Sequence, residues 1–237
     1  MTEPVHADAR LGSGAMFDRI AGRYDFVNRV ISLGIDERWR KRTVDALNIK
    51  PGARILDLAT GTGDLAIRIA LREPSVRVDG VDPSGAMLAI AREKTQARDL
   101  GSRTTFTVGI AEALPFPDDT FDGATIAFGI RNVPDRLAGL KEMARVTKSG
   151  GRVCVLELSE PAGGVLGPFA RFHIRKVVPR LGALLSGEKE YRYLEQSVRA
   201  FPSPKDFGAL MESAGLRVLE IRPFTFGVCC LYVAEVP

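Results

Sequence analysis

The chain has 237 residues, of which 45% are hydrophobic, so it can bury a full core and is expected to form one domain with an elaboration. Its net charge of +4 is interspersed rather than gathered in blocks, which is compatible with RNA, an anionic membrane or neither. Cys154, Cys229 and Cys230 lack metal-ligand spacing, the first residues lack the apolar run of a signal peptide, and no uncharged apolar run reaches about 18 residues. We therefore expect a cytoplasmic protein with reduced thiols, no metal and no membrane-spanning helix.

The first half of the chain changes from helical spacing to alternating strands and helices. Residues 1–50 are expected to form a polar arm and a helical cover, with helices over 16–32 and 36–47. Residues 51–160 are expected to form the nucleotide-binding core, with strands over 53–58, 76–82, 104–109, 123–128 and 151–158 and helices over 65–70, 85–99 and 134–146. This alternation predicts an α/β, Rossmann-like sheet with right-handed crossovers.

The second half adds an insert and then completes the same sheet. Residues 161–200 are expected to form a helical lid, followed in 201–237 by a helix over 203–214 and strands over 217–221 and 228–233. The two late strands, joined by a short turn, predict an antiparallel hairpin. The fold class is therefore a mostly parallel sheet of seven strands with an antiparallel last strand.

A glycine-rich turn, Gly61-Thr62-Gly63, joins the first strand to its helix. Glycines reach φ > 0 and let a ligand approach the backbone where a helix N-terminus presents unpaired N–H groups. Asp57 ends the strand before the turn, and Asp82 ends the next strand, where a ribose hydroxyl is expected. The turn also fits the dinucleotide pattern of NAD-binding proteins, and Asp57 could instead act as a helix cap in a plain packing turn.

The combination D-x-x-x-G-x-G resembles motif I of the class I S-adenosylmethionine (SAM) methyltransferases, whose acid faces the amino-acid end of the cofactor. The resemblance implies SAM as cofactor, bound by Asp57, Thr60, Gly61, Gly63, Asp82, Pro83, Ala111 and Glu112.

The stretch Phe128-Gly129-Ile130-Arg131-Asn132-Val133 follows the fourth strand, at the edge where open α/β sheets bind ligands. A buried arginine beside an asparagine is costly unless a polar or anionic group pairs with it. Arg131 and Asn132 are therefore the candidates for contact with substrate. The stretch lacks the prolines and aromatic residue common in amino-group methyltransferases, so methylation of nitrogen is disfavoured.

Two longer stretches indicate a particular family more specifically than the glycine-rich turn does. Residues 145–159, and residues 24–32 through Trp39, resemble the two signatures of the UbiE/MenG family, the quinone-ring C-methyltransferases of menaquinone and ubiquinone synthesis. Residues 128–133, 191–194 and 197–202 extend the resemblance over most of residues 16–231. It implies methylation of a prenylated quinol, with demethylmenaquinol to menaquinol as the first choice and the ubiquinone-pathway benzoquinol as the alternative. The chain departs from the family at Ile110, where an Asp or Asn usually contacts adenine, and in its last strand.

For that reaction we expect Arg131 to stabilise the developing oxyanion and Asn132 to orient the ring oxygen. Tyr24 is the first candidate for the general base and His173 the second. Both Tyr24 and Trp39 could instead be ordinary core aromatics.

The segment over residues 161–187 is apolar and basic and holds no acidic residue. It predicts either a lid with an apolar entrance for a polyprenyl tail, or peripheral contact with the inner face of an anionic membrane. Two other functions compete, an RNA methyltransferase and a non-catalytic methyltransferase-like subunit, although no RNA-binding module is evident and we expect no nucleic-acid partner. The sequence leaves open whether two copies form a homodimer.

Overall fold

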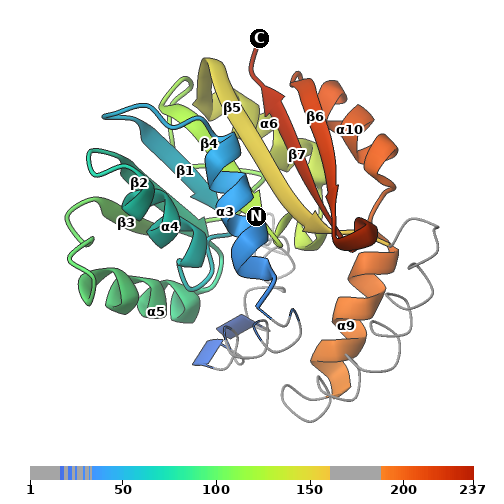
Figure 1. The fold of residues 1–237 in the computed structure, drawn as a ribbon, viewed down its shortest axis with the longest axis horizontal. Coiled ribbons are helices and arrows are strands. Elements are labelled where there is room, and N and C mark those ends of the chain that lie inside the picture. Colours follow the sequence, from blue (N-terminus) through green and yellow to red (C-terminus); the bar gives the residue numbers. More distant parts are fainter. Residues whose placement is uncertain are drawn as a thin grey trace, which may run out of the picture.

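The structure is a computed structural model, and it describes residues 17, 18, 21, 22, 25, 29, 32, 34–160 and 188–237, with backbone alone at 188–192. Its centre is one seven-stranded sheet in the order β3-β2-β1-β4-β5-β7-β6 (Figure 1). The strands are β1 (Arg54–Leu58), β2 (Arg77–Asp82), β3 (Thr104–Val108), β4 (Phe121–Ala127), β5 (Thr147–Leu158), β6 (Arg217–Phe224) and β7 (Cys229–Glu235).

Strands β1 to β5 pair in parallel, whereas β7 is antiparallel to both β5 and β6. The short helix η3 (Thr225–Gly227) joins β6 to β7, and so short a connection can link only antiparallel neighbours. The structure therefore confirms the predicted Rossmann-like sheet and the hairpin that completes it.

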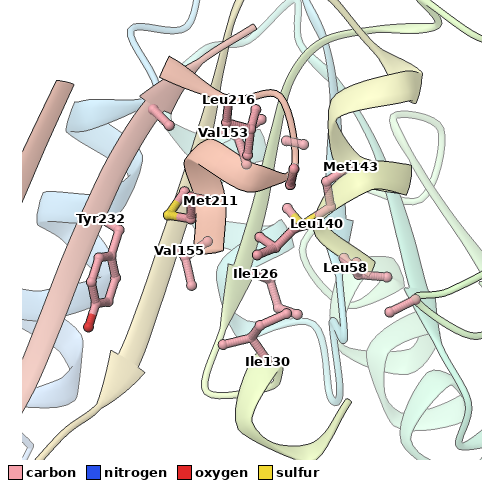
Figure 2. Packing of buried hydrophobic residues seen from close by; sticks show 14 of the residues in the cluster. Leu58, Ile126, Ile130, Leu140, Met143, Val153, Val155, Met211, Leu216 and Tyr232 are labelled. Atoms are coloured by element: carbon pink, nitrogen blue, oxygen red, sulfur yellow. The ribbon is translucent and has the colours of Figure 1, made fainter. Parts of the chain in front are cut away.

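Helices cover both faces of the sheet (Figure 1). One face carries α3 (Asp36–Ala46), α4 (Asp64–Arg72) and α5 (Gly85–Gln96), and the other carries α6 (Arg136–Val146) and α10 (Pro204–Ser213). Figure 2 shows the second interface, where Met143 of α6 and Met211 of α10 pack on Val153 and Val155 of β5. Each of these side chains is fully buried, which contributes about 1.5–3 kcal/mol per large apolar side chain. Two cores thus fix the sheet between its helices and leave the strand ends for the site.

The observed strands begin earlier than predicted in two places. β4 begins at Phe121, two residues before the predicted start, and β5 begins at Thr147 because Thr147 pairs with Phe121. Residues 147–150, which precede the predicted strand over 151–158, are therefore part of β5, although Gly150 has φ 75°. Its backbone N–H donates to the carbonyl of Val236 at 2.8 Å, so the end of the chain stabilises this irregular piece of strand.

Most of the predicted helix over 16–32 and all of 161–187 lie outside the described residues. From the insert, the structure describes α9 (Glu188–Arg199), which leads into α10. In the described part of the chain, no helix has the length and hydropathy needed to cross a bilayer. The same residues contain no group of three or more His, Cys, Asp or Glu side chains arranged to hold a metal ion.

Candidate active site

β1 ends in a turn whose glycines have the positive φ that the sequence predicted. Gly61 has φ 56°, and Gly63, the residue before α4, has φ 82°. A Cβ on Gly63 would lie 3.0 Å from the Cβ of Ala91 on α5. Gly61 therefore serves the backbone conformation of the turn, since a Cβ there would meet no other atom within 4 Å. Gly63 permits α4 and α5 to approach each other.

Two carboxylates lie at the ends of β1 and β2. Asp57 is buried and accepts a hydrogen bond from Oγ1 of Thr60 at 2.6 Å. Its burial raises its pKa to about 7, against the opposing effects of the Thr60 hydroxyl and the charge of Arg40. Asp82 accepts hydrogen bonds from the backbone N–H groups of Gly61 and Ser84, each at 2.9 Å, and burial raises its pKa as well. Both acids are thus held in water-poor surroundings, where a cationic ligand would stabilise their ionised forms.

A pocket lies at the carboxyl ends of β1, β2 and β4, where the strand order reverses and α/β sheets commonly bind ligands. Of the predicted site residues, the structure brings six into its lining: Gly61, Asp82, Pro83, Ala111, Glu112 and Asn132. Four lie outside the lining: Asp57, Thr60, Gly63 and Arg131. Tyr24 and His173 lie outside the described residues. The rest of the lining is mainly apolar and includes Phe17, Met87, Ile110, Phe128 and Val133.

The floor of the pocket is made by two turns in close contact. Ala59, after β1, and Phe128, after β4, both have positive φ, at 50° and 58°, and both line the pocket. A Cβ on Gly129 would lie 2.4 Å from the Cβ of Ala59, so only glycine lets the two turns meet. Such conformations cost of order 1–3 kcal/mol for residues other than glycine, and they commonly cluster at functional sites.

The N-terminal segment is fastened to the same edge of the sheet. Phe17 lines the pocket, and the carboxylate of Asp18 accepts hydrogen bonds from Oγ of Ser84 and the backbone N–H of Ala86, at the start of α5. Asp25 accepts a hydrogen bond from Oγ1 of Thr62 in the glycine turn and pairs with Lys94 of α5 at 2.9 Å. Asp18 and Asp25 therefore lie against the start of α5 and the glycine turn.

Arg131 lies behind the pocket, in a buried ion pair that sequence reasoning missed. Its Nη1 lies 2.8 Å from Oε1 of Glu157, and Nη1 also donates to the carbonyl of Phe128. Glu157 is fully buried at the end of β5, and its Oε2 accepts the backbone N–H of Arg131. The sequence does contain one sign of this ion pair, because Glu157 is an acidic residue within the apolar run 153–158 of a predicted strand.

Asn132, the next residue, lies on the pocket side of the short helix η1 (Ile130–Asn132). Its Oδ1 accepts a hydrogen bond from the hydroxyl of Tyr193 on α9 at 3.1 Å. Trp39, by contrast, is a core residue: its indole N–H donates to Oγ1 of Thr225, and its ring lies 6.4 Å from that of Phe128.

These residues fit SAM. The Asp82 carboxylate can accept hydrogen bonds from ribose hydroxyls, and Met87 and Ile110 supply apolar contact for a flat base. Ile110 therefore lines the pocket without the polar side chain that the family usually has at this position. The two buried acids complement the cationic sulfonium and ammonium groups of the cofactor.

Solved structures with low sequence identity share the fold. A SAM-dependent methyltransferase from Aquifex aeolicus aligns with a TM-score of 0.62 and 19% identity, over 84% of this chain and 89% of its own. The [4+2]-cyclase SpnF aligns with a TM-score of 0.73 and 17% identity, over 96% of each chain. At these identities the likeness establishes the class I, Rossmann-like architecture alone.

Sequence comparison is more specific. The chain is 48% identical to the "Demethylmenaquinone methyltransferase" of Thermus thermophilus over 94% of this chain and 100% of the relative. It is also 48% identical to the "Ubiquinone/menaquinone biosynthesis C-methyltransferase UbiE" of Geobacter sulfurreducens, over 93% of this chain and 86% of the relative. Residues 5–235 match the family model described as the ubiE/COQ5 methyltransferase family. The chain therefore belongs to the ubiE/COQ5 methyltransferase family, whose cofactor is SAM.

Proposed function

We propose that the protein methylates a ring carbon of a prenylated quinol and converts demethylmenaquinol to menaquinol. The observation that carries the proposal is the composition of the pocket: aromatic and aliphatic walls around one amide, that of Asn132, beside the acidic glycine turn. A quinol is a largely apolar ring whose reacting hydroxyl must be positioned, and such a lining suits it. The name of the Thermus thermophilus relative, which matches over its whole length, supports a naphthoquinol as acceptor.

Bound SAM would supply an electrophilic methyl group on its sulfonium. Asp82 and the Gly61 turn would hold the ribose, Asp57 and Thr60 would face the amino-acid end, and Pro83, Ala111 and Glu112 would border the adenine. The acceptor's hydroxyl would give up its proton, the adjacent ring carbon would accept the methyl group from SAM with loss of the carbon–sulfur bond, and that carbon would then lose its hydrogen as a proton while the ring oxygen regains one. Positioning the two reactants while excluding water would supply much of the acceleration.

Asn132 would donate from its NH₂ group to the ring oxygen as negative charge develops there. Arg131 would act through Asn132 and not on the acceptor itself, because Glu157 offsets its charge and the ion pair fixes the turn that carries Asn132. Tyr24 is the proposed general base on the strength of the sequence, and its place lies outside the described residues.

The benzoquinol of the ubiquinone pathway is the second candidate acceptor, favoured by the name of the Geobacter sulfurreducens relative, which covers both pathways. The deciding test is transfer of labelled methyl from SAM to chemically reduced demethylmenaquinol, to the matching benzoquinol and to structured RNA, run side by side. We expect label in the naphthoquinol. Label in RNA alone, or SAM binding without any transfer, would overturn the proposal and favour an RNA methyltransferase or a non-catalytic subunit.

Variants connect that assay to the site. Asn132→Ala should lower turnover about 100- to 1,000-fold, because it removes a hydrogen-bond donor that acts on developing charge. SAM affinity should stay near the wild-type value. Asn48→Gly is the matched control, because Asn48 is exposed, has φ 52° and does not line the pocket.

We further propose peripheral contact with an anionic membrane. The segment first implicated, 161–187, lies outside the described residues. In the described part, support comes from a surface hollow between α3 and the β6–η3 connection, lined by Arg38, Arg42 and Arg222 with Trp39 and Phe224. Phe226, beside this hollow, is 57% exposed, and aromatic and cationic side chains together suit a lipid headgroup layer.

Flotation with anionic vesicles tests membrane contact. One variant carries Arg38→Glu and Arg42→Glu, and the other carries Arg171→Glu, Arg175→Glu and Lys176→Glu. Reduced flotation of one variant would assign the membrane contact to the segment changed in that variant. Flotation of both variants at the wild-type level would refute the assignment of the contact to either segment. Sedimentation of the wild-type protein over a range of concentrations would show whether it forms a homodimer.

A further inference from the structure

α9 makes a polar contact with the pocket through Tyr193. The Tyr193 hydroxyl donates to Oδ1 of Asn132 across 3.1 Å, and both residues are partly buried. These residues are 61 positions apart, and η1 and α9 lie in contact along this bond. The part of the insert that the structure describes, α9, is thus joined by a hydrogen bond to the one neutral polar side chain in the pocket lining, which is the side chain that the proposed reaction uses.

The bond has a chemical consequence because a carboxamide is both a donor and an acceptor. Its oxygen accepts hydrogen bonds, its NH₂ group donates them, and a rotation by half a turn exchanges the two. In the described part of the chain, the bond from Tyr193 is the only hydrogen bond made by the Asn132 side chain. With one lone pair of its oxygen engaged by Tyr193, the amide keeps both N–H donors of its NH₂ group available for a ligand.

We propose that Tyr193 is a positioning residue that fixes the orientation of the Asn132 amide, so that the pocket presents a donor to the acceptor's ring oxygen. This inference rests on the proposed function and deepens it. It assigns to the site a preference for acceptors that carry a hydrogen-bond-accepting oxygen, and a disfavour for acceptors that would place an N–H donor there. It also makes the geometry of Asn132 depend on the position of α9.

The test uses Tyr193→Phe, which removes the hydroxyl and keeps the ring. Glu195→Gln is the matched control, because it breaks an ion pair with Arg199 on the same helix without touching Asn132. Tyr193→Phe should lower the turnover number about three- to tenfold, the value of one neutral hydrogen bond, with SAM affinity within about twofold of wild type. The control should keep wild-type turnover.

A double-mutant cycle separates positioning from general packing. In the Asn132→Ala background, Tyr193→Phe should change turnover less than about twofold, because the bond it removes is already absent. Equal effects in both backgrounds would show that Tyr193 acts through packing alone and would overturn the inference.

Hydrogen exchange gives a readout that needs no acceptor. Backbone amides of residues 130–133 and of α9 should exchange faster in Tyr193→Phe than in wild type or Glu195→Gln. Unchanged exchange in both segments would overturn the inference, even in an enzyme that methylates the quinol. If wild type transfers no methyl to any quinol, the proposed function fails, and exchange still decides whether Tyr193 couples α9 to Asn132.

Discussion

Replacing Asp57 with asparagine should stabilise the protein without its cofactor, although the same change weakens the cofactor site. The Asp57 side chain is about 1% exposed, and burial raises its pKa from 3.8 to about 7. Between these pH values the folded state binds more protons than the unfolded state, so this carboxyl lowers stability progressively as pH rises. A shift of roughly three pKa units corresponds to about 4 kcal/mol, which sets the upper limit of the gain from an uncharged isostere.

Urea unfolding of wild type and Asp57→Asn from about pH 5 to about pH 8 measures this gain. The stability difference should grow by about 1.4 kcal/mol per pH unit up to the folded-state pKa and be constant above it. Asp119→Asn, on an exposed turn where φ is 53°, is the control and should show no such growth. A stability difference that stays constant with pH, or that shrinks as pH rises, would refute this reasoning.

Asp57→Asn should weaken the binding of SAM although it stabilises the protein without SAM. Cationic SAM favours the ionised carboxylate, so binding should lower the pKa of Asp57 and release about half a proton near neutral pH. Calorimetry in two buffers with different ionisation enthalpies measures this release. Asp57→Asn should weaken SAM binding about tenfold or more and abolish the release. Release that persists in the variant would show that another group carries it.

Three further predictions concern the surroundings of the pocket. Glu157→Gln should lower the free energy of unfolding by about 3 kcal/mol in urea titrations, because it leaves the buried Arg131 cation without its partner. Gly129→Ala should cost about 1–3 kcal/mol and reduce turnover, since the two floor turns must separate, whereas Gly85→Ala, where a Cβ meets open space, should be neutral or stabilising in the same assays. The three buried cysteines should resist iodoacetamide in the folded protein and react after unfolding. They are inaccessible in the folded state, and burial raises the pKa of Cys154 to about 12. Rapid labelling of the native state would contradict this prediction.

The order of the strands and helices could be predicted from the sequence because apolar periodicity is a local property. What periodicity could not supply was pairing between distant segments. The polar turn before Gly151 reads as a loop by its composition, yet Gly150 donates to Val236, 86 residues later, and the segment becomes strand. The same limit explains the early start of β4, which depends on the pairing of Phe121 with Thr147.

The candidate site divides in the same way. The glycine turn and Asp82 could be predicted because the turn itself requires those residue types. Glu157 and Tyr193 were missed as partners because their contacts span 26 and 61 residues, and neither lies in a motif that identifies its partner. Arg131 was predicted to contact substrate from its place after the fourth strand and from the cost of burying it, and the structure shows the carboxylate that offsets that cost.

The charges around the pocket restrict the kind of acceptor that can react there. Asp82 and Glu112 line it, which suits a cationic cofactor, while Glu157 neutralises Arg131 behind it. In the proposed reaction the acceptor side would present the neutral amide of Asn132, which would stabilise an oxygen that gains charge during the reaction more than it would attract an anion at rest. The Michaelis constant for a neutral quinol should accordingly vary less than about twofold between about 50 and about 500 mM salt, where screening changes strongly. A steep rise with salt in initial-rate assays would instead show that charge contributes to acceptor binding, and the neutral lining inferred for the acceptor side would be wrong.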